Sequence, residues 1–142
     1  MILYIDTASH DEIIIALRSD EKDGCKLMVQ KKIVAPRQQA EKLVPAIDRL
    51  LRTKKVKLSD LTKIVVANRG GSFTSLRIGV ITANALAYAL KIPVVAEPRS
   101  PQPKKKFADY SIVEPIYDRE PNIGVSQKML KIGKRSVNRP VH

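Results

Sequence analysis

Asn68-Arg69-Gly70-Gly71-Ser72-Phe73-Thr74-Ser75-Leu76-Arg77-Ile78-Gly79 is the most informative run of residues in this chain of 142. It follows Lys63 to Ala67, an Ile- and Val-rich run typical of a buried strand. The paired glycines predict a tight turn, and Ser72 or Thr74 can cap a helix that continues to about Leu90. The run therefore predicts a strand, a glycine turn and a helix in succession.

The elements around this run complete a layered α/β pattern. Upstream, Ile2 to Asp6, Glu12 to Arg18 and Lys26 to Val34 predict three strands joined by tight turns, an antiparallel meander. Downstream, Ile92 to Ala96 predicts a last strand. Between the third and fourth strands lies a predicted helix. Its apolar stripe repeats every three or four residues and comprises Ala40, Leu43, Val44, Ile47, Leu50 and Leu51.

Pro45 lies within that stripe and is expected to kink the helix or to mark a late start. The predicted order of elements is βββαβαβ, with a mixed sheet. That is the order of one half of the actin-like (ribonuclease H-like) ATPase fold, which is the fold class we predict.

The amino-acid composition limits the classes of protein to which this chain can belong. The chain is 44% apolar and 28% charged, as in a soluble globular domain. We expect no membrane segment, because no apolar run approaches the ~20 residues needed to span a bilayer. No basic region precedes the first apolar run, so we expect no signal peptide. The single cysteine, Cys25, and these features together predict a cytoplasmic location.

The charge pattern divides the chain at about residue 98. The net charge is +12, of which residues 1–98 hold +6 and the much shorter 99–142 the other +6. We therefore predict an actin-like subdomain over 1–98 and a basic, Pro- and Lys-rich, largely irregular tail over 99–142. A solvated surface explains such a tail. The alternative is a small tRNA-binding module that acts through Lys104, Lys105, Lys106, Lys131, Lys134 and Arg135.

Two features could carry nucleotide chemistry. Asp6 ends the first strand, where it could orient a metal and a nucleotide or simply bond to the backbone of a turn. The Gly70-Gly71 loop, with Ser72 to Thr74 and Arg77, could hold a phosphate or merely cap the helix. An ATPase-like enzyme using Asp6 and this loop is thus an alternative function. His10 and His142 do not have the spacing of metal ligands, so no metal site is predicted. No cofactor is predicted either.

Small residues recur every four positions on the helix after Thr74, at Gly79, Ala83 and Ala87. Such a face lets another element approach closely. It either packs on the chain's own sheet or docks on a partner helix.

Several segments resemble the TsaB family of tRNA threonylcarbamoyladenosine biosynthesis proteins. Residues 1–7 resemble the opening strand, and residues 39–51 the first helix, with Gln39 where His is usual. Residues 69–79 resemble the signature Gly-Pro-Gly-Ser-Phe-Thr-Gly-Leu-Arg-Ile-Gly, with departures that include Gly70 and Ser75. Residues 114–119 resemble a segment near the end of full-length chains. The second actin-like half would lie between these regions, so a shortened family member without a closed nucleotide cleft is expected.

The resemblance implies a non-catalytic scaffold subunit that binds TsaD, the enzyme that transfers the threonylcarbamoyl group to adenosine 37 of tRNA (t6A). The family's M22 glycopeptidase-like label comes from TsaD, whose metal-binding histidine pair this chain lacks. A TsaE-like ATPase of the same complex is a second implied partner, and the tail an auxiliary tRNA contact. The implied partner-binding residues on the two helices are Leu43, Ile47, Leu50, Gly79, Ala83 and Ala87.

Overall fold

The computed structural model describes residues 1–21, 24–97 and 111–117. It contains β1 (Ile2–Asp6), β2 (Glu12–Arg18), β3 (Leu27–Val34), β4 (Lys63–Val66) and β5 (Val94–Ala96). The helices are α1 (Gln39–Thr53), the short 3-10 helix η1 (Leu58–Asp60) and α2 (Phe73–Leu90). The order of strands and helices predicted from the sequence is therefore confirmed.

The five strands form one mixed sheet in the order β3-β2-β1-β4-β5. β1 pairs antiparallel with β2, and β2 antiparallel with β3, which is the predicted meander. β4 pairs parallel with both β1 and β5, because each of these connections returns through a helix. The topology agrees with the actin-like half predicted above.

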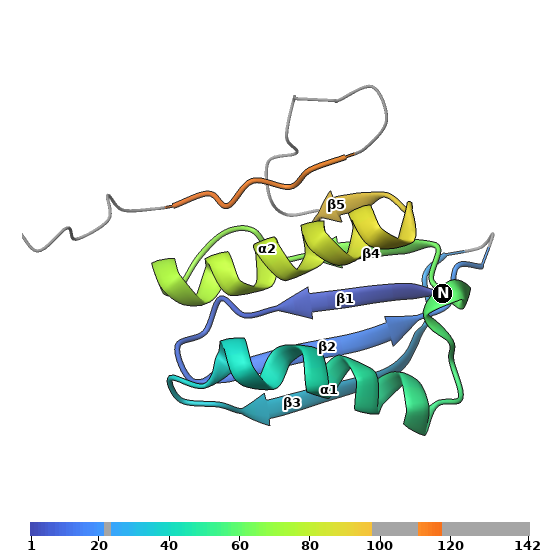
Figure 1. The fold of residues 1–142 in the computed structure, drawn as a ribbon, viewed down its shortest axis with the longest axis horizontal. Coiled ribbons are helices and arrows are strands. Elements are labelled where there is room, and N and C mark those ends of the chain that lie inside the picture. The colour runs from blue at the N-terminus through green and yellow to red at the C-terminus, as the bar shows by residue number, and fades with distance from the viewer. Residues whose placement is uncertain (22–23, 98–110, 118–142) are drawn as a thin grey trace, which may run out of the picture.

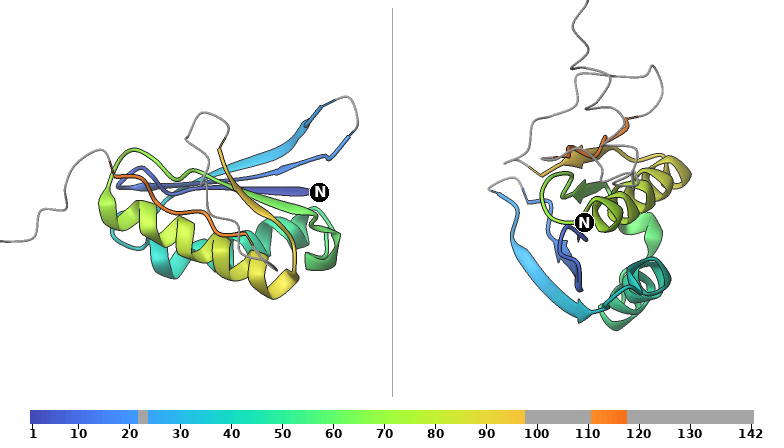
Figure 2. Two further views of the ribbon diagram at one scale, coloured as in Figure 1. Left: turned by 90° about the horizontal axis from the view of Figure 1, so that it is seen from above. Right: turned by 90° about the vertical axis from the view of Figure 1, so that its left-hand side faces the viewer.

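Both long helices cover the same side of the sheet (Figures 1 and 2). Alternate strand residues such as Leu3, Ile5, Ile15 and Ile64 point toward the helices and form the main core. A smaller apolar cluster, with Ile2, Tyr4, Ala16 and Val65, occupies the opposite side of the sheet. Successive side chains of each strand point to opposite sides of the sheet and so contribute to two separate apolar layers.

Helix α1 begins at Gln39 and continues through Pro45 to Thr53. The expectation of a late start is therefore wrong. The side chain of Gln39 is buried, and its amide donates hydrogen bonds to the carbonyls of Ser9 at 2.6 Å and Glu12 at 2.9 Å. These bonds tie the first turn of α1 to the start of β2, which explains why the helix begins six residues before the proline.

Helix α2 is apolar enough, at a mean hydropathy of 1.3 over 18 residues, to cross a membrane by length and composition alone. A core helix of a globular domain meets the same criterion. In this structure Leu76, Val80, Ala83 and Ala87 of α2 are buried within the domain. That packing accounts for one face of α2, since 33% of the 18-residue window is buried.

Candidate functional site

The glycine loop is fastened to the end of β1. Gly70 and Gly71 have φ angles of +92° and +66°, which side-chain-bearing residues rarely adopt. A Cβ atom on Gly71 would overlap the carbonyl oxygen of Ala8. The next amide, that of Ser72, donates to the same oxygen at 2.9 Å. Glycine at position 71 is therefore required by the close approach of the two chain segments.

Thr7 continues this connection into helix α2. Its hydroxyl donates to the carbonyl of Ser75 at 2.5 Å and accepts from the amide of Gly79 at 3.0 Å. An ordinary α-helix would join those two backbone groups directly. The threonine hydroxyl is instead inserted between them, and a Cβ atom on Gly79 would overlap Thr7 Oγ1. The sequence indicated a small residue at 79 but not its partner, Thr7.

Asp6 serves the same junction. Its Oδ1 accepts a hydrogen bond from the amide of Ala8 at 2.8 Å. Of the two roles that the sequence allows for this carboxylate, this is the turn-forming one. No group of three or more His, Cys, Asp or Glu side chains gathers within the described ranges.

The loop also caps α2. Ser72 is the N-cap residue, and its Oγ accepts from the amide of Ser75 at 3.4 Å. The predicted capping by Ser72 is confirmed. Thr74 is exposed on the first turn. A phosphate site at this loop stays a prediction.

The remaining signature side chains form a stack. The ring of Phe73 stacks on that of Tyr117, with the centroids 4.1 Å apart, and the guanidinium of Arg77 lies 5.5 Å from the Phe73 centroid. This stack joins the start of α2 to residues 111–117. No local pattern indicates the pairing of Phe73 with Tyr117, because the two are 44 positions apart.

Residues 111–117 run along α2 on the side away from α1 (Figures 1 and 2). The Asn84 side chain donates to the carbonyl of Val113 at 2.8 Å and accepts from its amide at 2.9 Å. Asn68 likewise donates to the carbonyl of Glu114 at 2.9 Å. Val113 is 1% exposed and belongs to the main core. The packed unit therefore extends past the boundary predicted at residue 98, and the other tail residues lie outside the described ranges.

The predicted partner-binding residues are not on the surface. All six are buried between the helices and the sheet: Leu43, Ile47, Leu50, Gly79, Ala83 and Ala87. The alternative of packing on the chain's own sheet describes their place in this structure. The physical reason is that the sheet extends under both helices, so the small-residue face of α2 rests on it and on Thr7.

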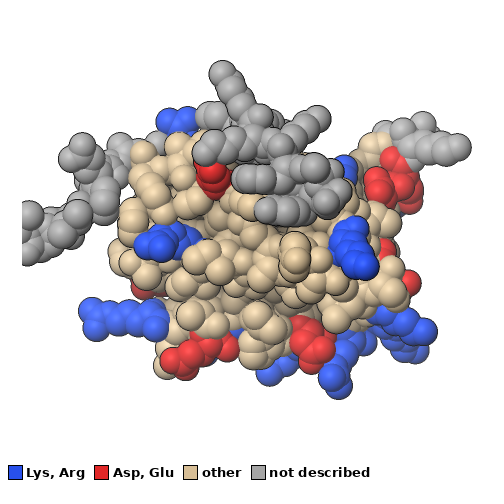
Figure 3. Space-filling view, turned by 45° about the horizontal axis from the view of Figure 1, so that its top comes forward, with Lys and Arg blue, Asp and Glu red and all other residues tan. Residues whose placement is uncertain are grey.

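Other residues form the outer face of the two helices. A shallow groove of about 330 Å³ between α1 and α2 is lined by Ala40, Arg77, Ile78, Ile81 and Thr82 together with Thr74. Ile81 is 59% exposed, and Val44, one turn beyond Ala40, is 51% exposed. Figure 3 shows a broad uncharged area on this side, with charged side chains mostly toward its rim. We call this surface, Ala40, Val44 and Ile81 with the groove, the outer helix face.

The opposite side of the sheet holds a tyrosine in an unusual setting. The guanidinium of Arg18 lies 4.5 Å from the centroid of the Tyr4 ring. Burial raises the pKa of the Tyr4 hydroxyl far above its usual value, with smaller contributions from the carboxylates of Asp6 and Glu97. Tyr4 is therefore neutral throughout the range in which most proteins are stable.

Three comparisons with known proteins agree with the fold. Residues 31–97 match the family model TsaD, tRNA N6-adenosine threonylcarbamoyltransferase. The chain is 38% identical to the TsaB biosynthesis protein of Bacillus subtilis over 95 residues, which are 67% of this chain and 39% of that protein. It is 41% identical to the tRNA N6-adenosine threonylcarbamoyltransferase of Rhodopirellula baltica over 63 residues, 44% of this chain and 18% of that enzyme.

Among solved structures, YeaZ from Pseudomonas aeruginosa superimposes with a TM-score of 0.58 at 30% identity. The match covers 68% of this chain and 42% of YeaZ. The chain thus spans about two fifths of the length of its TsaB and YeaZ relatives. Over about two thirds of its length, this chain belongs to the TsaB family of tRNA threonylcarbamoyladenosine biosynthesis proteins.

Proposed function

We propose that this chain is a non-catalytic subunit that binds a TsaD-like protein through the outer helix face. The observation that carries the proposal is the exposure of Ile81 and Val44 beside the groove between α1 and α2. Apolar side chains exposed around a groove are typical of protein contact sites. The family resemblance implies that the same two helices pair with TsaD.

A pull-down of TsaD tests this proposal. Ile81→Glu should weaken retention of TsaD strongly, because docking would bury a carboxylate in place of an apolar side chain. Met28→Glu is the matched control, since Met28 is 52% exposed on β3, away from the outer helix face. Equal retention of TsaD by both variants would contradict the proposal.

Ala83 is not a suitable position at which to test docking. It is fully buried, so Ala83→Glu should unfold the chain rather than report on the partner. Ile81 lies on the same helix, two positions earlier, with its side chain toward solvent. Circular dichroism should therefore show a native spectrum for Ile81→Glu and a disordered one for Ala83→Glu.

The absence of catalysis is part of the proposal. The Oδ1 atom of Asp6 is engaged in the turn at the end of β1, which supports a structural role for this carboxylate. Isothermal titration with Mg-ATP should detect no tight binding. Tight binding that disappears in Asp6→Asn, a variant that keeps an acceptor for the Ala8 amide, would instead favour the ATPase-like alternative.

Two further partners belong to the same proposal: a TsaE-like ATPase, and tRNA bound by the cations beyond residue 98. Their support is the family resemblance and the charge of the sequence. A cytoplasmic location accompanies them, since the machinery acts on tRNA.

A further inference from the structure

A second groove lies on the other side of α1, between this helix and β3. Its volume is about 630 Å³. Ile15, Ile33, Pro45, Ala46 and Leu50 supply apolar walls. Charged side chains stand along its margins: Lys31, Glu41, Lys42 and Arg49. We call this the β3–α1 groove, and it shares no lining residue with the groove of the outer helix face.

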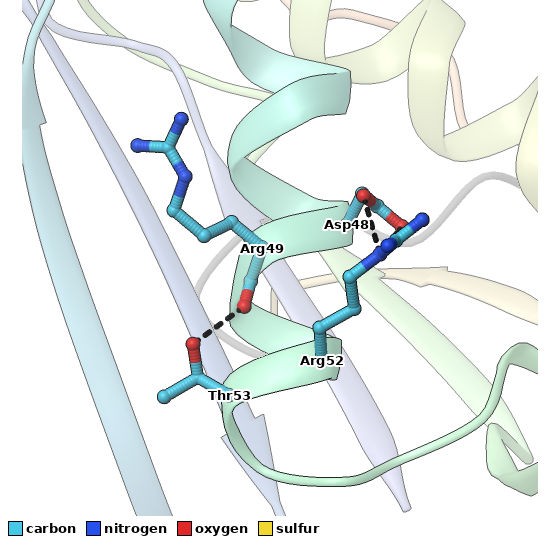
Figure 4. A network of polar contacts seen from close by, with 4 residues as sticks. All are labelled: Asp48, Arg49, Arg52 and Thr53. Atoms are coloured by element: carbon cyan, nitrogen blue, oxygen red, sulfur yellow. Dashed lines mark hydrogen bonds and ion pairs between the residues drawn. The ribbon is translucent and has the colours of Figure 1, made fainter.

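The cations of the β3–α1 groove differ from their neighbours. Lys32, next along β3, forms an ion pair with Glu12 at 2.8 Å, and Arg52 of α1 forms one with Asp48 at 2.9 Å. Within the described ranges, the side chains of Lys31, Lys42 and Arg49 have no such partner. Figure 4 shows the arrangement on α1: Arg49 extends from the side that carries Thr53, away from Asp48 and Arg52.

Lys31 lies on the side of β3 where the alternation of the strand would place an apolar residue. It pairs in register with Ile15, whose side chain is fully buried on the helix side of the sheet. Lys31 therefore occupies a position that would ordinarily hold a core residue. An inward-facing lysine protects an edge strand from pairing with another sheet. That explanation covers Lys31 but not Lys42 and Arg49 on the facing helix.

Pro45 adds an acceptor to the same wall. It has no amide hydrogen, so the carbonyl of Glu41 lacks the helix donor four residues on. Glu41 and Pro45 both line the groove. The site therefore combines apolar walls, a net positive charge and a backbone oxygen that lacks its usual donor.

We propose that the β3–α1 groove binds an acidic amphipathic peptide segment of a partner protein, with carboxylates on Lys42, Arg49 and Lys31. Lys42 and Arg49 are seven residues apart, about 10 Å along the helix axis. This spacing requires at least two carboxylates on one ligand, which a peptide offers and a simple fatty acid does not. The lining contains no aromatic side chain on which a nucleic-acid base could stack.

Fluorescence anisotropy with the full chain tests the proposal. The probe is a labelled amphipathic peptide of Leu and Glu, with glutamates two helical turns apart. The salt concentration is about 0.15 M, which screens the distant charges of this basic chain. Arg49→Glu and Lys42→Glu should each weaken binding about tenfold, because each replaces an attraction by a repulsion.

Lys26→Glu is the matched control, because Lys26 is an exposed cation outside the groove. It makes the same change of charge and should alter the affinity less than about twofold, because it does not line the groove and its charge is screened by the salt. Two further peptides separate the contributions. One carries Gln for Glu and the other Ser for Leu, and both should bind more weakly than the probe.

Several results would overturn the proposal. Equal losses in Lys26→Glu and Arg49→Glu would mean that the peptide responds only to total charge. Equal binding of the Ser-for-Leu peptide would show that the apolar walls have no part. Displacement of the probe by tRNA, together with loss of tRNA binding in Arg49→Glu, would make the groove a nucleic-acid site. Retention of TsaD is scored separately and should be unchanged in Arg49→Glu, so failure here is distinct from failure of the outer-face proposal.

Discussion

At the scale of single residues, the hydroxyl of Thr7 replaces a hydrogen bond of helix α2. It links the Ser75 carbonyl to the Gly79 amide, and the missing side chain of Gly79 makes the room. Close packing against Thr7 therefore explains why the last residue of the signature run, Gly79, is a glycine. It also fixes the direction in which α2 leaves the glycine loop.

Gly79→Ala should lower the free energy of unfolding by about 1–3 kcal/mol, because the new methyl group overlaps Thr7 Oγ1. Chemical denaturation measures the loss. Removing the hydroxyl as well, in Thr7→Ala/Gly79→Ala, should let α2 form its ordinary bond. The double variant should then recover part of the loss, a coupling of about 1 kcal/mol or more. Additive losses would show that the two residues are independent.

Tyr4 predicts a dependence of stability on alkaline pH. Its raised pKa means that the folded state keeps the proton after an unfolded tyrosine, with a pKa of about 10, has released it. The stabilisation is complete below about pH 10 and is lost as the pH rises further, because the unfolded state then binds fewer protons. Wild type should therefore lose more stability between about pH 9 and 11 than Tyr4→Phe does.

Denaturation curves at the two pH values measure that difference. Tyr88→Phe is the control, since Tyr88 is 71% exposed. Its variant should behave like wild type across the alkaline range. The same pH dependence in wild type and Tyr4→Phe would exclude Tyr4 as the responsible group.

At the scale of elements, one helical side chain makes two of the hydrogen bonds that hold residues 111–117. Asn84 holds the amide and the carbonyl of Val113 at once. Asn84→Ala should weaken this docking by about 1–3 kcal/mol, since both backbone groups lose their partner. Amide exchange at Val113 should accelerate about tenfold or more. Thr82→Ala, on the groove side of α2, should leave that exchange unchanged.

Local patterns predicted the elements well because most of them depend on contacts near in sequence. The apolar stripe indicated α1, and the glycine turn with Ser72 indicated the start of α2. The docking of residues 111–117 could not be predicted in this way, because Asn84 and Val113 are 29 positions apart. The available signals were an asparagine inside an apolar helix and the apolar content of Ile112 to Tyr117.

The candidate site was harder to predict than the fold for a physical reason. A helix stripe such as Leu43, Ile47 and Leu50 has the same periodicity whether it faces its own sheet or a partner. Only the extent of the sheet decides between these, and it extends under both helices here. On the outer helix face, Ala40 and Val44 belong to the predicted apolar stripe of α1 and are nevertheless exposed, whereas Ile81 lies outside the small-residue repeat of α2.

At the scale of the whole molecule, the sheet separates two apolar layers and α1 separates two grooves. The outer helix face is largely uncharged, whereas the β3–α1 groove is cationic. The two proposed partners would therefore contact different residues. The third proposed contact, with tRNA, rests on the basic side chains that the sequence has in residues 118–142.

Removal of residues 118–142 tests that hypothesis and keeps every residue that the structure describes. This segment has six basic and two acidic side chains, so its loss lowers the net charge from +12 to +8. A cut at residue 98 would also remove Val113 from the core and confuse folding with binding. The chain ending at Tyr117 should keep its unfolding midpoint.

The truncated chain should bind tRNA more weakly at low salt, with a shallower dependence of affinity on salt. Each phosphate that the shorter chain fails to neutralise should reduce the slope of log K against log salt by about 0.7–0.9, because fewer counterions are released on binding. The matched control keeps the full length, replaces the six cations by Gln, and replaces Asp118 by Asn and Glu120 by Gln, which gives the same net charge of +8. If charge is responsible, both proteins should show the same loss of affinity. If the truncated chain bound tRNA with unchanged affinity and slope, residues 118–142 would have no part in tRNA binding, and cations of residues 1–117 would have to supply it.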